Sequence, residues 1–137
     1  ARLSGFDTAI IGNGLESTTL FGVHKSADVF IVSGNADVSQ RKIDVSEVLP
    51  SKEGEKIRET YLELKTKRST LADVTTFGEQ ALRDGTGPAA PLIAWQAGAL
   101  AYLAGEGSSF QDGFEAAGAY LKRGKSYRYL MEFVNQK

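Results

Sequence analysis

The sequence contains no cysteine and only one histidine, His24, in 137 residues. Without cysteine there can be no disulfide bond, no thiolate metal site and no cysteine nucleophile, and the redox compartment stays undetermined. His24 stands beside Lys25 in an expected loop, with no second histidine to share a metal ion. This setting favours a surface histidine over a general base or a ligand.

The chain also has no large excess of positive or negative residues, because 16 basic and 17 acidic residues leave a formal charge of -1. No overall field draws the chain to nucleic acid or to an anionic membrane, so we expect no nucleic-acid partner. The most apolar stretch, Ala89 to Ala104, has 16 residues and includes Gln96 and Gly98. It is shorter than the roughly 20 residues that span a bilayer and predicts a buried core helix instead.

The length and the 42% of hydrophobic residues suit a single domain over residues 1–137, strand-rich in 1–50 and helical in 51–137. The chain starts at Ala1, without an initiator Met or an apolar signal segment. It is therefore expected to be a processed mature form, a fragment or part of something longer. Processing would make an organelle or the periplasm a possible location.

Three strands are expected in the first part of the chain. Thr8 to Ile11 is an apolar run stopped by Gly12, as in a buried strand with neighbours on both sides. Asp28 to Val32 and Val38 to Val45 flank Ser33-Gly34-Asn35-Ala36, where Gly and Asn tolerate positive φ. These last two strands are predicted to form a β-hairpin. One face of Val38 to Val45 is expected to be in contact with water.

Helical spacing and boundary residues dominate the second part. Pro88 suits a helix start, Ser109 precedes Asp112 in a capping-box-like arrangement, and Gly105 and Gly124 suit helix ends. The predicted helices are Glu53 to Lys65, Leu71 to Arg83, Ala89 to Ala104, Ser109 to Arg123 and Ser126 to Asn135. The fold class is thus α/β with α+β character: a short central strand and a hairpin, then four to five helices.

Two of these helices carry apolar stripes at i, i+3, i+4 spacing. The first stripe contains Phe110, Phe114, Ala117 and Leu121, and the second contains Tyr127, Leu130, Met131 and Val134. Packing requires this spacing, so we interpret both stripes as core and not as a cofactor-binding surface.

Several segments, taken in order, resemble the C-terminal part of anthranilate phosphoribosyltransferases, members of glycosyltransferase family 3. They are Ala9 to Ser17, Ile43 to Val48, Leu82 to Ala90, Ile93 to Gly98 and Phe110 to Gly113. The resemblance covers nearly all of this chain but only the last part of a family member. It implies a truncated phosphoribosyltransferase α/β domain.

In that family the enzyme transfers a phosphoribosyl group from phosphoribosyl pyrophosphate to an aromatic amine, with magnesium. The family's glycine-rich diphosphate loop and Lys-His-Gly-Asn segment belong to its first half and have no equivalent here. Its magnesium-binding Asp-Glu pair is matched by Glu16 and Ser17. One carboxylate beside a hydroxyl makes a much weaker metal site, so Glu16 is a degenerate magnesium ligand or simply a solvated turn residue.

Two further clusters have a functional and a structural interpretation. Asp84-Gly85-Thr86-Gly87 has too few glycines for a phosphate loop, and Pro88 removes a donor, so a turn before a helix is favoured. The basic residues Lys122, Arg123, Lys125 and Arg128 alternate with Tyr120, Tyr127 and Tyr129. They could bind an acidic protein face or a phosphate backbone, although cations also suit solvated helix ends.

The residues therefore predict a non-catalytic, structural or accessory subunit of a larger assembly, in which other protein subunits cover surfaces left open by the truncation. A photosynthetic or respiratory complex in an organelle is one possible assembly for such a subunit. No catalytic or cofactor-binding residue is assigned, and whether the chain is an enzyme stays open, with the balance against it. The alternative is a fragment or split subunit of an active phosphoribosyltransferase, which would bring magnesium with it.

Overall fold

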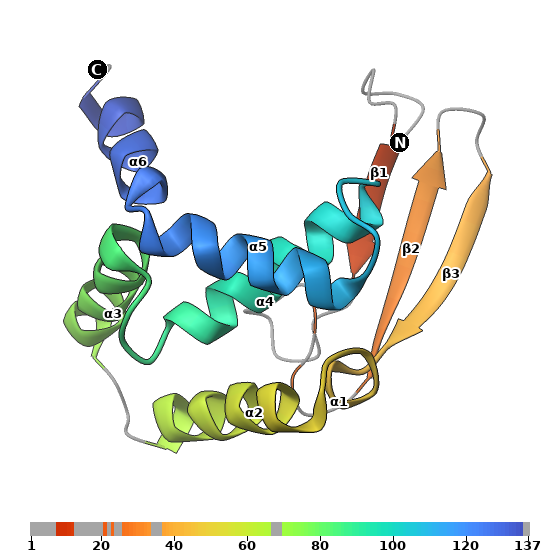
Figure 1. Ribbon diagram of the computed structural model, residues 1–137, viewed down its shortest axis with the longest axis horizontal. Coiled ribbons are helices and arrows are strands. Elements are labelled where there is room, and N and C mark those ends of the chain that lie inside the picture. Colours follow the sequence, from red (N-terminus) through yellow and green to blue (C-terminus); the bar gives the residue numbers. More distant parts are fainter. Residues whose placement is uncertain are drawn as a thin grey trace.

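The computed structural model describes residues 8–12, 21, 23, 26–33, 37–66 and 70–135. In this part of the chain a three-stranded antiparallel sheet is followed by helices, which confirms the small α/β fold. The elements are β1 (Thr8–Gly12), β2 (Ala27–Ser33), β3 (Val38–Ile43), α1 (Val45–Val48), α2 (Ser51–Thr66), α3 (Leu71–Asp84), α4 (Ala90–Leu103), α5 (Phe110–Lys122) and α6 (Lys125–Asn135). In Figure 1, α4 and α5 reach from the sheet to α3, and α6 lies at the end of the molecule away from the sheet.

The predicted hairpin is confirmed, because β2 pairs with β3 from Ala27 opposite Ile43 to Val32 opposite Val38. The strand order is β1-β2-β3, so among the described residues β1 is an edge strand with one neighbour. The expectation of a buried central strand is therefore wrong for Thr8 to Ile11. Strand side chains alternate between faces, so a short apolar run can lie at an edge with half of its residues outward, as Ile11 does at 54% exposure.

The core lies between one face of the sheet and the helices. Trp95 of α4 is completely buried at its centre, and the ring of Phe21 meets it edge-on at 6.1 Å. The side-chain amide of Gln96 donates to the carbonyl of Phe21 at 2.8 Å and accepts from its N–H at 3.0 Å. The fully or nearly buried members are Phe21, Val23, Ala27, Val29, Ile43, Val45, Leu49, Ile57, Trp95, Ala99 and Leu103.

The polar residue between β3 and α1 ends the strand earlier than the sequence suggests. Asp44 is the N-cap of α1, and its Oδ1 accepts from the N–H of Ser46 at 2.9 Å. Arg58 of α2 forms an ion pair with the same oxygen at 3.4 Å and donates to the carbonyl of Val23 at 3.0 Å. Val45 thus begins a helix, and its assignment to the second hairpin strand is wrong because the cap stabilises the helical turn.

Local capping signals confirm the predicted helix boundaries to within about two residues. Thr70 and Asp73 form a reciprocal capping box at the start of α3. Ser109 accepts from the N–H of Asp112 at 3.0 Å at the start of α5. Gly105 and Gly124 have φ values of 89° and 65°, the left-handed conformation that glycine adopts without strain after a helix.

Two helices approach each other closely where Gly98 of α4 meets Gly113 of α5. A Cβ built on Gly98 would lie 2.5 Å from the backbone of Gly113, and one on Gly113 would lie 2.4 Å from the carbonyl oxygen of Gly98. Gly98 is one of several small residues in α4, and its missing side chain makes room for the other helix. Its partner Gly113 becomes evident only from the packing.

The two apolar stripes differ in burial. Phe110 and Phe114 of α5 pack against the core, and Leu121 is buried, so the first stripe is core as predicted. The second stripe is not, because α6 has no buried residue. This part of the prediction is wrong: among the described residues α6 makes its main contacts with α3 and α5, and Leu130, Phe133 and Val134 stay exposed.

Candidate functional site: a cleft between α2 and α5

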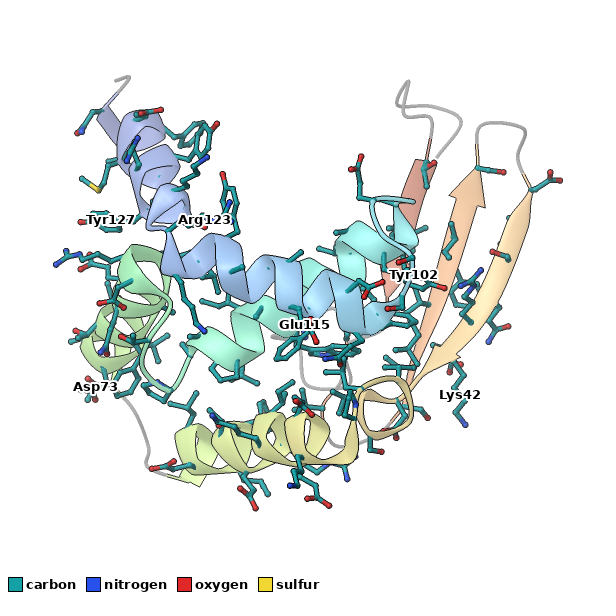
Figure 2. All side chains as sticks on the ribbon, in the orientation of Figure 1. Lys42, Asp73, Tyr102, Glu115, Arg123 and Tyr127 are labelled. Carbon is teal, nitrogen blue, oxygen red and sulfur yellow. The ribbon has the colours of Figure 1, made fainter. Side chains whose placement is uncertain are left out.

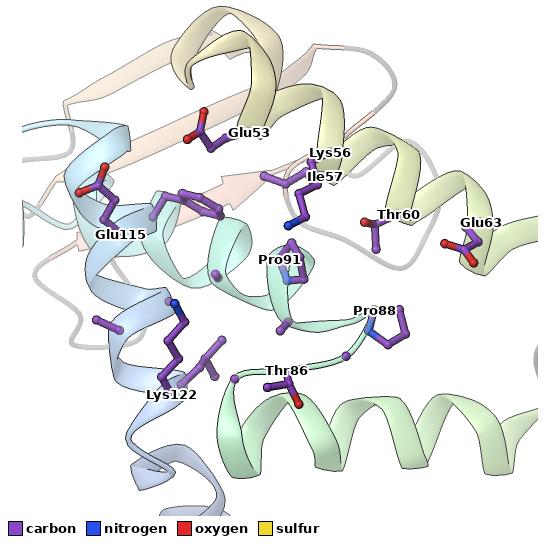
Figure 3. A pocket seen from close by; sticks show the side chains of 18 residues that line it. Glu53, Lys56, Ile57, Thr60, Glu63, Thr86, Pro88, Pro91, Glu115 and Lys122 are labelled. Atoms are coloured by element: carbon purple, nitrogen blue, oxygen red, sulfur yellow. The ribbon is translucent and has the colours of Figure 1, made fainter.

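A cleft of about 660 Å³ opens between α2 and α5, with the beginning of α4 and the α3–α4 turn completing its wall (Figure 3). Its apolar lining comes from three helices and includes the buried side chains of Ile57, Ala94 and Leu121. The other apolar members are Ala90, Pro91, Phe114 and Ala119, with Pro88 from the turn. This volume lies within the roughly 300–1,000 Å³ usual for small-molecule sites.

Small residues on the facing elements leave this space open. Gly118 and Ala119 form part of the α5 wall, and the turn at Gly85-Thr86-Gly87 forms another part. Gly85 and Gly87 have φ values of 69° and 79°. A Cβ on Gly85 would lie 2.7 Å from the backbone nitrogen of Lys122, so glycine is required here both for the turn and for its contact with α5.

The turn preceding α4 is held by its own polar side chains. Asp84 Oδ1 accepts from the N–H of Thr86 at 3.0 Å and from its hydroxyl at 2.6 Å. This is an Asx-type turn between two helices, in agreement with the predicted interpretation of Asp84-Gly85-Thr86-Gly87. The sequence did not predict that this turn also lines the cleft.

Charged side chains are distributed unevenly along the cleft. In Figure 3 the amino group of Lys56 points into the space beside Pro91, and Lys122 extends along the α5 wall into the same space. Neither lysine has a carboxylate of the described residues within ion-pair distance. Glu53 and Glu115 lie toward one end of the cleft, apart from the amino group of Lys56 (Figure 3). With Glu63 the lining holds three carboxylates and two ammonium groups, separated along the cleft.

This arrangement suits binding by charge and apolar contact. The polar groups of the lining are lysine ammonium groups, glutamate carboxylates and the hydroxyls of Thr60 and Thr86. Among the described residues there is no group of three or more Asp, Glu or His side chains that could hold a metal ion.

The predicted basic cluster is divided by the structure. Lys122, at the end of α5, lines the cleft, whereas Arg123 caps that helix and Lys125 and Arg128 belong to α6. All four side chains are exposed. Glu16, Ser17 and His24, the other residues singled out from the sequence, lie outside the described residues.

One tyrosine of the cluster has a structural role. Tyr127 lies between α6 and α3 (Figure 2), where the guanidinium of Arg83 sits 4.7 Å from its ring centroid and donates to its hydroxyl at 3.2 Å. The hydrogen bond and charge of Tyr127 raise the pKa of Arg83 above its ordinary value. Tyr127 therefore helps to attach α6, while Tyr129 is 65% exposed.

Sequence reasoning did not identify Lys56, Glu53 or Glu115 as members of a site. In the sequence they are ordinary charged residues of exposed helices, with nothing to distinguish them from Lys52 or Glu55. Only the packing of α2 beside α5 brings Lys56 and Lys122 to one cleft.

No protein-family model matches this chain, and none of the curated proteins is similar to it at a significant level. The resemblance to anthranilate phosphoribosyltransferases therefore stays a prediction from the residues. Among the described residues, no helix combines the length and the hydropathy that a bilayer span requires.

Proposed function

We propose that this protein is a non-catalytic binding or structural subunit of a larger protein assembly, built on a truncated domain like that of the anthranilate phosphoribosyltransferases. The observation that carries the proposal is the exposure of α6. This 11-residue helix has no buried residue, although its apolar side chains cover more than half of its circumference. Phe133 is 74% exposed and Val134 is 52% exposed.

An apolar surface of this kind is a liability for a protein that works alone. Contiguous exposed apolar patches usually mark an interaction site, because covering them releases free energy in proportion to the area removed from water. The exposed apolar residues of α6 are Tyr129, Leu130, Met131, Phe133 and Val134. A partner subunit with an apolar surface of its own would cover them.

The outer face of the sheet supports the same conclusion. Ile11 of β1 lies opposite Phe30 of β2, and both side chains point away from the helices and are exposed. Val38 of β3 is exposed on the same face. The two edges of the sheet differ: β3 carries Arg41 and Lys42, which discourage pairing with another strand, while β1 carries no charged residue.

The proposal is tested by size-exclusion chromatography with light scattering on the purified chain. We expect concentration-dependent association, because without its partner the α6 surface meets other copies. Phe133→Glu should reduce this association, since it places a charge in the middle of the exposed surface. Val74→Glu is the matched control, an exposed apolar residue of α3 at 56% exposure.

A monodisperse, well-folded monomer at every concentration, with no companion protein in native extracts, would count against the proposal. A photo-crosslinking residue at position 133 should capture a stoichiometric subunit from such extracts, while one at position 74 should not. If the captured companion carries a glycine-rich diphosphate loop and the pair consumes phosphoribosyl pyrophosphate, the split-enzyme alternative is correct instead. An organellar location, photosynthetic or respiratory, belongs to the same proposal and is tested by the identity of the companion.

A further inference from the structure

The geometry of the cleft between α2 and α5 points to a second binding site: we propose that it takes a small anionic molecule with an apolar body. The carboxylate or phosphate of the ligand would lie between Lys56 and Lys122, with its apolar part against Pro91, Phe114 and Ala119. This proposal does not depend on the proposed function, since the cleft contains no residue of α6.

The shape of the cleft supports a small molecule as its occupant. Its volume of about 660 Å³ would hold a ligand of one or two rings, and its lining comes from three helices and a turn, not from a single helix face. Ile57 and Ala94 are nearly inaccessible to solvent and lie beneath the surface of the cleft, whereas Pro91, Phe114 and Ala119 keep part of their surface exposed. Apolar contact with these three exposed residues would supply most of the affinity.

The two lysines of the lining favour a negatively charged ligand. Lys56 comes from the middle of α2 and Lys122 from the last turn of α5, so the two lysines stand on facing walls of the cleft (Figure 3). An ammonium group with no ion-pair partner among the described residues is available to a ligand. Each of these two groups can attract a carboxylate or phosphate that enters the cleft.

The three glutamates of the lining do not cancel this preference. Glu53 and Glu115 stand at one end of the cleft, and Glu63 stands toward the C-terminal end of α2 (Figure 3). These carboxylates would repel an anion placed at the ends and leave the centre to it. A ligand with hydroxyl or amino groups on its apolar body could reach Glu53 and Glu115.

Nuclear magnetic resonance titration of the full chain tests the site with 1-naphthoate as the probe. We expect saturable shifts of the amide signals of Gly85, Gly87 and Gly118, which line the cleft. The neutral analogue 1-naphthalenemethanol should bind at least several-fold more weakly. Inorganic phosphate, titrated separately, should shift the same signals weakly, because it satisfies the lysines without using the apolar lining.

Variants separate this site from general attraction to basic residues. Lys56→Gln and Lys122→Gln should each weaken naphthoate binding about fivefold, the upper range for an exposed ion pair. Ala119→Phe should block the cleft without altering the lysines. Lys125→Gln is the matched control, an exposed lysine near Lys122 that does not line the cleft, and it should leave the affinity unchanged.

Equal binding of the neutral analogue, equal loss in Lys125→Gln, or shifts confined to α6 would each overturn the proposal. So would the absence of saturable shifts. None of these results would bear on the association of α6 with a partner, so the two proposals can fail independently.

Discussion

At the residue scale, the contact between Gly98 and Gly113 leaves no room for any side chain on either residue. Each glycine occupies the place where the other helix's backbone passes, and neither has room for a methyl group. The many small residues of α4 suggest close packing, but only one of them meets a glycine across the interface.

Gly98→Ala should therefore lower the free energy of unfolding by about 1–3 kcal/mol, the usual range for inserting a methyl group into a packed interface. Urea denaturation followed by circular dichroism measures the change. Gly78→Ala in α3 is the control, because no atom lies within 4 Å of the added Cβ. It should raise stability by roughly 0.5–1 kcal/mol through helix propensity, and a similar loss in both variants would contradict the packing account.

At the scale of the element, α6 was predicted to bury its apolar stripe in the core, but the structure leaves that stripe exposed. Its apolar residues follow helical spacing as well as those of α5 do, and the helix forms where the sequence predicts it. Its attachment is local, through Tyr127 and Arg83 and through the turn at Gly124. The helix therefore depends on a small number of contacts.

Tyr127→Ala should loosen α6 without unfolding the remaining helices, because it removes both the hydrogen bond and the stacking with Arg83. Hydrogen exchange of the amides from residue 128 to 135 should accelerate several-fold, while those of α4 stay unchanged. Tyr127→Phe keeps the ring under the guanidinium and should have a smaller effect. Equal acceleration throughout the molecule would mean that α6 is not a separate unit of stability.

At the scale of the whole molecule, carboxylates at three helix starts contribute to the response to acid. Hydrogen bonds from Thr70 lower the pKa of Asp73, and hydrogen bonds from Ser108 and Ser109 lower that of Asp112. Burial raises the pKa of Asp44, but the hydrogen bonds from Ser46 and the charge of Arg58 outweigh it, so this pKa is lowered too. All three ionised forms are thus favoured by the folded state.

A carboxylate whose pKa is lower in the folded state stabilises the protein above its ordinary pKa of 3.8, and this contribution disappears as the pH falls through the folded value. We expect the free energy of unfolding to be level near neutral pH and to fall below about pH 4. Urea denaturation between pH 7 and pH 2.5 measures this dependence. The double variant Asp73→Asn, Asp112→Asn should be less stable at neutral pH and show a flatter decline, and an unchanged decline would contradict the assignment.

The sequence alone determined the order, type and approximate limits of the three strands and of the five longer helices, because the signals for these are local. Asp112 after Ser109, the glycines at 105 and 124, and the turn residues at 33–36 act on neighbours a few residues away. Helical spacing likewise identified the stripe of α5. The capping carboxylate at Asp44 was the local signal that the strand assignment of Val45 missed.

The tertiary structure decided which surfaces are covered and which residues meet. The same apolar spacing is core in α5 and exposed in α6, since exposure depends on whether another element lies against the helix. The edge position of β1 and the meeting of Gly98 with Gly113 are also products of packing. Lys56 and Lys122 are 66 positions apart in the sequence and share one cleft because α2 and α5 both pack beside α4, an arrangement that no local pattern encodes.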